Sequence, residues 1–88
     1  MKIHELKTLP EYFQSIKMGK KNFEIRFNDR NFKISDVLCL REYDNNIGAY
    51  TGAELFVKVD YILDKFGGLV DGFVIMSISI IENIVINV

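Results

Sequence analysis

The hydrophobic pattern of this chain changes its period at Gly19, and no other feature restricts the possible folds as strongly. Before Gly19, apolar side chains recur every three or four residues, which is the spacing of one face of an α-helix. After Gly19, apolar and polar residues alternate from Phe23 onward, which is the spacing of a strand with one buried face. We therefore expect one short N-terminal helix followed by strands.

Residues 9–18 are predicted to form the helix. Thr8 is placed to cap its N-terminus, and Glu11, three residues later, is placed to complete a capping box. Pro10 falls in the first turn, where a proline sacrifices no hydrogen bond. Gly19 supplies the left-handed residue that commonly ends a helix.

The rest of the chain favours β structure broken by polar or glycine-rich turns. The strands are predicted at residues 2–7, 23–27, 37–43, 54–62 and 73–81, with the tail 82–88 as a further ordered strand. The segments on either side of the predicted loop 44–52 are expected to pair as an antiparallel hairpin. This order predicts an α+β fold, a partial β-barrel of about five to six mostly antiparallel strands with one N-terminal helix.

The strand that follows the helix is expected to bury one of its faces. Phe23, Ile25 and Phe27 form its apolar row. Glu24 and Arg26 alternate with them and form a polar row on the opposite side. The apolar row is therefore predicted to face the core, and the polar row to face outward.

Length and composition exclude several classes of protein. The 88 residues leave room for a single domain, expected to span residues 1–88. No apolar run reaches the length of a signal peptide core or a membrane span, and the lone Cys39 cannot form an internal disulfide, so we expect a cytoplasmic protein with no membrane contact. Cys39 itself is expected to be an inert core residue. Because the chain has one histidine and no cofactor-binding motif, we expect that it binds neither a metal ion nor a cofactor.

The charge is unevenly distributed along the chain. Residues 1–43 hold nine basic and six acidic side chains, a net charge of +3, whereas residues 44–88 hold two basic and six acidic ones, a net charge of −4. Because the whole chain has a net charge of −1, we do not expect a protein that coats duplex nucleic acid. A small anion or a few nucleotides bound by the basic half fits this distribution.

Three ionisable residues lie where the predicted helix gives way to the next strand. Lys21 precedes the strand, and Glu24 and Arg26 share one face of it. An arginine can hold a phosphate or a base edge through two hydrogen bonds, and a glutamate accepts from exocyclic amines. We therefore predict that these three residues bind a ligand, and Lys21 and Glu24 are also the candidates for a catalytic role. A solvated, salt-bridged face is the alternative interpretation.

A family resemblance begins at these residues. Gly19, Lys21, Glu24 and Arg26 match the G-x-K-x-x-E-x-R pattern of ASCH domains, which belong to the PUA-like superfamily. Further matching stretches resemble a bacterial and phage branch of the family whose function is uncharacterised, so that the resemblance covers most of residues 2–80. These stretches are residues 4–7, 9–13, 28–30, 40–43 and 50–52.

The resemblance implies a small β-barrel with a flanking helix, and a cleft lined by the motif that binds RNA or a nucleotide-like ligand. Some ASCH proteins are amidohydrolases that deacylate a modified cytidine with a lysine, a threonine and a distant glutamate. Lys21 matches the lysine, but Glu24 stands in the position of the threonine, so the hydroxyl nucleophile of that reaction is missing. A carboxylate in a desolvated cleft could still act as a base toward water.

Other residues are weighed between ligand binding and a structural role. His4, Lys7 and Arg30 are second-rank ligand candidates, as a titratable group, an added positive charge and a clamp in a polar turn, respectively. Tyr43 and Tyr50 are better candidates for stacking on a base than the other aromatic residues. The aromatic residues expected mostly in the core are Tyr12, Phe13, Phe23 and Phe27.

Three functions follow from these observations and stay open at this point. The favoured one is a module that binds RNA or a nucleotide-like small molecule. The first alternative is an amidohydrolase that acts on an acylated or otherwise modified nucleoside. The second is a protein-interaction module of bacterial or phage origin that uses the apolar tail, residues 82–88, as an added edge strand, which also allows a homodimer.

Overall fold

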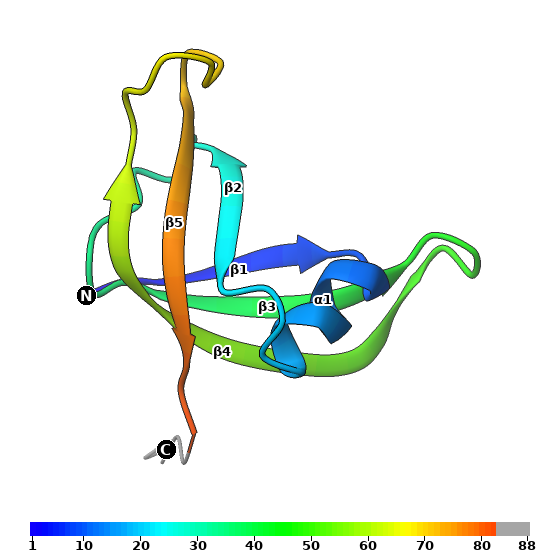
Figure 1. Cartoon of the computed structure of the whole chain (residues 1–88). Helices are drawn as coiled ribbons and strands as arrows, with labels where there is room; N and C mark the ends of the chain where they lie inside the picture. Colours follow the sequence, from blue (N-terminus) through cyan, green and yellow to red (C-terminus); the bar gives the residue numbers. More distant parts are fainter. Residues whose placement is uncertain (83–88) are drawn as a thin grey trace.

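The structure, a computed structural model, describes residues 1–82 and shows one curled sheet with one short helix (Figure 1). The elements are β1 (Ile3–Thr8), α1 (Pro10–Lys17), β2 (Phe23–Phe27), β3 (Val37–Asp44), β4 (Ala49–Leu63) and β5 (Phe73–Ile80). The five strands form one sheet in the order β1-β3-β4-β5-β2. β1 and β3 run parallel, and the other neighbouring pairs are antiparallel. The α+β class and the mostly antiparallel sheet are therefore confirmed.

The sheet curls into a half-barrel, so that its two edge strands, β1 and β2, approach each other (Figure 1). Two arginine side chains cross the space between these edges. Arg26 donates to the carbonyl oxygen of Lys7, and Arg30 donates to the carbonyl oxygen of Glu5, each at 3.0 Å. Hydrogen bonds from these two side chains, and not a ladder of backbone hydrogen bonds, therefore close the half-barrel between β1 and β2.

The core fills the inner face of the curled sheet beneath α1. Phe13 and Ile16 of α1 are almost fully buried and project from the helix toward this face. Leu38 and Leu40 of β3, against which α1 packs, are fully buried as well. The prediction that Phe13 belongs to the core is confirmed.

The helix starts one residue later than predicted and lacks the predicted cap. Leu9 is the N-cap residue, and no side chain caps the helix. The hydroxyl of Thr8 is buried instead and lies 3.4 Å from the carbonyl oxygen of Leu6, so the capping box with Glu11 is wrong. The C-terminal end is as predicted, because Gly19 has the left-handed φ of +77°.

The hairpin between β3 and β4 is longer than predicted. Tyr50 pairs with Tyr43 and Ala49 pairs with Asp44, so most of the expected loop 44–52 is strand. The amide of Gly48 donates to the carbonyl oxygen of Asp44 at 2.8 Å and closes a tight turn. The ring centroids of the two tyrosines are 5.1 Å apart, and this cross-strand contact explains why the polar and glycine-containing segment pairs in spite of its composition.

β2 has the opposite orientation to the predicted one. Phe23, Ile25 and Phe27 are 43%, 50% and 55% exposed, whereas Glu24 is only 3% exposed. The alternation is correct, but the face assigned to the core is wrong, because the charges of Glu24 and Arg26 are satisfied inside the half-barrel. The expectation that Phe23 and Phe27 are core residues is wrong for the same reason.

The predicted strand at residues 82–88, and its use as an added edge or dimer contact, falls on residues 83–88, which lie outside the described part. Within residues 1–82, no helix is long and apolar enough to cross a bilayer.

We expect the substitution Phe13→Ala to lower the free energy of unfolding by about 3 to 5 kcal/mol, because it opens a cavity between α1 and the sheet. Denaturant unfolding monitored by circular dichroism measures this change. Met18→Ala, at a position that is 64% exposed, is the control and should change the free energy by less than about 0.5 kcal/mol. Equal effects of the two substitutions would contradict the core assignment.

Candidate functional site

A cleft with a volume of about 680 Å³ lies between α1 and β2, beside the end of β1. This volume is within the usual range for sites that bind small molecules. The three predicted ligand-binding residues, Lys21, Glu24 and Arg26, all line it. Lys7 and Thr8, the last two residues of β1, complete the margin nearest the arginine.

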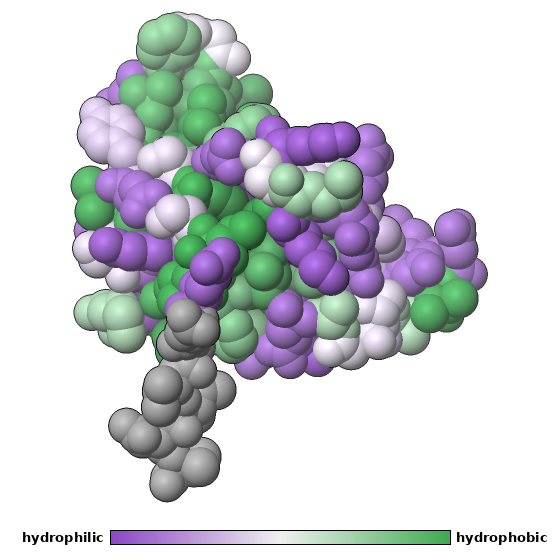
Figure 2. Space-filling model, turned by 60° about the horizontal axis from the view of Figure 1, so that its bottom comes forward, coloured by the Kyte–Doolittle hydropathy of each residue, from purple (hydrophilic) through white to green (hydrophobic). Residues whose placement is uncertain are grey.

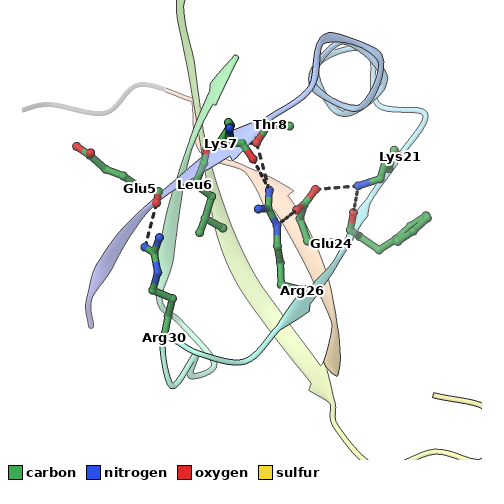
Figure 3. Close-up of polar contacts among 9 residues, drawn as sticks. Glu5, Leu6, Lys7, Thr8, Lys21, Glu24, Arg26 and Arg30 are labelled. Carbon is green, nitrogen blue, oxygen red and sulfur yellow. Dashed lines mark hydrogen bonds and ion pairs between the residues drawn. The ribbon is translucent and has the colours of Figure 1, made fainter. Parts of the chain in front are cut away.

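Lys21, Glu24 and Arg26 form one hydrogen-bonded group in this cleft (Figure 3). The Nζ atom of Lys21 donates to Oε1 of Glu24, and Nε of Arg26 donates to Oε2, both at 2.8 Å. The carboxylate side chain is 4% exposed, whereas the lysine and arginine side chains are 17% and 26% exposed. The structure therefore brings the three residues together with the carboxylate at the bottom and the cations nearer to solvent.

The end of α1 explains how Lys21 reaches the carboxylate. After Gly19 turns the chain, the amide of Lys21 donates to the carbonyl oxygen of Ser15 at 3.0 Å, which holds this residue against the end of the helix. The ammonium group also donates to the carbonyl oxygen of Phe23 at 2.7 Å. Two acceptors therefore fix the position of the lysine Nζ.

Arg26 connects this group to the neighbouring edge strand. Its Nη2 atom donates to the carbonyl oxygen of Lys7 at 3.0 Å and lies 3.4 Å from the hydroxyl oxygen of Thr8. The guanidinium is therefore held both at Nε, by Glu24, and at Nη2, by β1. A side chain fixed in this way loses little further conformational entropy when a ligand binds.

The two cations keep hydrogen-bond donors that the protein does not use. A lysine has three donors and an arginine has five. Within residues 1–82, one donor of Lys21 and the Nη1 group of Arg26 have no protein acceptor. Both oxygens of Glu24 already accept from a cation. Because the group contains two cationic side chains and one carboxylate, it has one positive charge in excess. This arrangement can bind an anionic group such as a phosphate or a carboxylate.

Apolar and aromatic side chains border the charged group. The Nζ atom of Lys21 lies 5.5 Å from the ring centroid of Tyr12 and 4.9 Å from that of Phe23. Both rings are nearly half exposed, so the prediction that Tyr12 lies mostly in the core is wrong. Figure 2 shows hydrophobic residues in the middle of the surface, with hydrophilic residues on both sides. The site therefore combines cationic donors with apolar area.

Lys7 and Arg30 lie along β1 but contribute in different ways. The side chain of Lys7 turns away from the charged group, and its Nζ atom lies 4.2 Å from the ring centroid of Tyr43. Lys7 therefore joins the candidate site mainly through its backbone carbonyl, which accepts from Arg26. Arg30 binds the carbonyl oxygen of Glu5, two residues before Lys7, and does not line the cleft.

His4 lies at the other end of β1, four residues before Thr8, which is roughly 13 Å along the strand. It is buried, and its Nε2 atom is 2.8 Å from Oδ2 of Asp36. Asp36 also accepts hydrogen bonds from the backbone amides of Lys2 and Lys33, each at 3.0 Å. This pair joins the start of β1 to the turn before β3, and the structure does not bring His4 to the cleft.

Tyr43 and Tyr50, the predicted stacking residues, also lie outside the cleft. Lys7 and Arg41 lie over their rings, at 4.2 Å from the respective centroids, and the two rings meet edge to face. The two cationic side chains therefore cover ring faces on which a base would have to stack. The cleft offers Tyr12 and Phe23 in their place.

Cys39 is buried, as predicted. Burial, together with the carboxylate of Glu54, which accepts from the sulfur at 3.0 Å, raises the pKa of its thiol to about 12. A thiol with this pKa forms almost no thiolate near neutral pH, so the residue has no nucleophilic role. Within residues 1–82, no three His, Cys, Asp or Glu side chains are arranged to hold a metal ion.

Sequence reasoning missed Thr8 and a further buried carboxylate, Glu42, as inward-facing polar residues. Thr8 pairs with Glu42 across β1 and β3, and Glu42 accepts from the hydroxyl of Thr51 at 2.8 Å and from the amide of Gln14 at 3.0 Å. The alternation of β1, in which His4, Leu6 and Thr8 are all buried, was the signal that could have placed Thr8 inside.

Comparison with known proteins assigns the chain to a family. Residues 3–78, which include the whole cleft, match the family described as a domain of unknown function, DUF3850. The chain belongs to this family. A relative from Escherichia phage P2, described as an uncharacterized 12.9 kDa protein in the GpA 3′ region, is 36% identical over 70 residues. That alignment covers 80% of this chain and 62% of the relative, so the chain spans less than two thirds of the relative's length.

The Asp36 carboxylate should make the stability of this DUF3850 domain depend on pH. Burial by itself would raise the pKa of Asp36, but the hydrogen bonds from His4 and from the amides of Lys2 and Lys33 outweigh it, and the pKa falls below its usual value of 3.8. Because the pKa is lower in the folded state, the contribution to stability is complete above the unfolded pKa and is lost as the pH falls through the folded one.

We therefore expect Asp36→Asn to lower the free energy of unfolding by about 1 to 3 kcal/mol at pH 7. The difference from the wild type should shrink as the pH falls below about 4, because the unfolded wild type is protonated first and the folded protein only at lower pH. Urea unfolding at a series of pH values measures this difference, with Asp64→Asn, at an exposed carboxylate, as the control. A difference that stays constant down to the acid limit would contradict this role.

Proposed function

We propose that the protein is a PUA-like module of the ASCH type that binds RNA or a nucleotide-like small molecule in the cleft between α1 and β2. The observation that carries the proposal is the Lys21–Glu24–Arg26 group, whose two cations are fixed by 2.8 Å bonds to one buried carboxylate. The match to the G-x-K-x-x-E-x-R pattern at these residues supports it.

The chemistry of the cleft fits a phosphate joined to a planar, partly apolar group. The unused donors of Lys21 and Arg26 suit a phosphate oxygen, since both side chains form charge-assisted hydrogen bonds to phosphates. Tyr12 and Phe23 flank the lysine and offer ring area to a base. The excess of one positive charge supplies attraction without requiring a basic surface over the whole protein, in agreement with the net charge of −1.

The contacts favour binding over hydrolysis. Each oxygen of Glu24 already accepts from a cation, so the carboxylate is committed to positioning Lys21 and Arg26 and is poorly placed to take a proton from water. The hydroxyl of Thr8 lies 3.4 Å from Nη2 of Arg26, but Thr8 is only 2% exposed, so its hydroxyl is poorly accessible to a substrate. We therefore place the amidohydrolase activity second, and release of acid from acylated cytidine by the purified protein would reverse this order.

We expect the substitutions Lys21→Ala and Arg26→Ala each to weaken the binding of short single-stranded RNA or of nucleotides by at least about tenfold, which corresponds to ~1.4 kcal/mol. Fluorescence anisotropy with labelled oligonucleotides and calorimetry with nucleotides measure the affinity. Lys65→Ala, at an exposed lysine in the β4–β5 connection, removes the same charge outside the cleft and should leave the affinity within about twofold.

Two outcomes would contradict the proposal. One is that neither RNA nor any nucleotide binds the wild-type protein. The other is that Lys65→Ala weakens binding as much as the cleft variants, because the attraction would then depend on total charge and not on this site. Thermal unfolding of each variant, followed by circular dichroism, shows whether Arg26→Ala also loosens the contact with β1.

A further inference from the structure

The outer face of the half-barrel carries an uncharged apolar surface over β2, its neighbour β5 and the next strand, β4. Register places Phe23, Ile25 and Phe27 of β2 beside Ser77, Ile75 and Phe73 of β5. On the other side of β5, Tyr61 lies beside Ser77 and Leu63 beside Ile75. Their inner-face neighbours, Glu24, Met76 and Ile62, point the other way. We call the surface formed by these eight residues the outer apolar face; its members are Phe23, Ile25, Phe27, Tyr61, Leu63, Phe73, Ile75 and Ser77.

This face is comparable to the largest apolar patches of typical monomers, which are often functional. Phe23, Ile25, Phe27 and Tyr61 are 43%, 50%, 55% and 61% exposed. With about 200 Å² for a fully exposed aromatic side chain, these fractions and the half-buried members together leave on the order of 500 Å² of apolar surface. Monomeric proteins rarely expose contiguous apolar patches beyond a few hundred Å², and larger ones usually mark contact sites.

The exposed rings are also held in place. A Cβ atom at Gly72, whose φ is +87°, would lie 2.6 Å from the ring of Phe27, so this ring lies directly on the glycine backbone. The same ring meets Phe73 edge to face, with centroids 5.5 Å apart. A rigid aromatic side chain loses little conformational entropy on association, which favours its use in an interface.

We propose that the outer apolar face is the interface between two copies of this chain in solution. The row Phe23-Ile25-Phe27 is symmetric about Ile25, and a two-fold interface must be self-complementary in this way. An antiparallel arrangement with the axis at Ile25 places each Phe23 on Phe27 of the partner subunit. Two faces stacked in this manner bury on the order of 1,000 Å², which reaches the lower limit of a specific interface.

The charges around this face agree with the antiparallel arrangement. The exposed Lys20 precedes β2, whereas the ammonium of Lys21 is bound to Glu24 in the cleft. Asp29 follows β2, with Asp71 close by because the amide of Asn28 donates to the carbonyl oxygen of Gly72, and the guanidinium of Arg30 is directed to the carbonyl oxygen of Glu5. A two-fold axis at Ile25 therefore brings the basic end of β2 toward the acidic end of the partner. A two-fold arrangement with the strands parallel would instead place the basic end of β2 opposite the basic end of the partner strand, so that like charges would oppose each other.

The dimer does not depend on the proposed ligand, but it borders the cleft. Phe23 and Ile25 belong both to the outer apolar face and to the walls of the cleft. Phe27 and Tyr61 belong to the face alone. Substitutions at Phe27 therefore test the dimer without altering the cleft.

Sedimentation velocity of the 88-residue chain over a range of micromolar concentrations tests the proposal. We expect a mass of twice 10.2 kDa for the wild type and 10.2 kDa for Phe27→Asp at the same concentrations, with an association at least about tenfold weaker. Ile47→Asp places the same charge at another exposed apolar residue, in the β3–β4 turn, and should remain dimeric. A wild-type protein that stays monomeric throughout would overturn the proposal.

A cysteine placed at the proposed axis gives an independent measurement. Ile25→Cys should form a disulfide-linked dimer on mild oxidation with a copper–phenanthroline catalyst, whereas Ile47→Cys should not; the native Cys39 is buried and does not interfere. The chain ended after Glu82 should dimerise like the wild type. If instead this truncation abolished the dimer and Phe27→Asp kept it, the contact would belong to residues 83–88 and the proposal would be wrong.

Discussion

Arg26 holds together the two features on which this structure depends, the buried carboxylate of Glu24 and the open side of the half-barrel. Its Nε atom binds the carboxylate, and its Nη2 atom binds the carbonyl oxygen of Lys7 on the opposite edge strand. Burial of a carboxylate costs several kcal/mol unless cations and hydrogen bonds compensate it. Here Lys21 supplies the second cation, so that the charge which closes the half-barrel also builds the candidate site.

The reversed orientation of β2 connects this inner group to the outer apolar face. Because residues alternate along a strand, Glu24 and Arg26 can face inward only if Phe23, Ile25 and Phe27 face outward. An edge strand that simply buried its apolar row would give up the ion pairs and the contact with β1. The orientation of β2 therefore determines both surfaces at once: its inner face contributes cationic donors to the cleft, and its outer face contributes the apolar residues of the proposed interaction surface.

The positions of the elements could be predicted from local patterns, and the contacts between them could not. The helix, Gly19 at its end and all five strands follow from the period of the hydrophobic residues, since this period reflects backbone geometry alone. The predicted N-cap at Thr8 is wrong because Thr8 is part of β1 and its side chain points to the inner face of the sheet, where it is buried. The prediction of a loop at 44–52 is wrong because the pairing of Tyr43 with Tyr50 outweighs the turn propensity of the residues between them.

For the candidate site, the sequence alone determined that Lys21, Glu24 and Arg26 lie close together, because three residues within six positions at a helix–strand junction cannot be far apart. Only the tertiary structure decided that the carboxylate is buried, that β1 supplies an acceptor, and that Tyr12 and Phe23 border the cleft. The physical reason is that alternation defines two faces without saying which one is inside. That choice depends on partners far away in the chain, here the carbonyl oxygen of Lys7, which lies nineteen positions before Arg26.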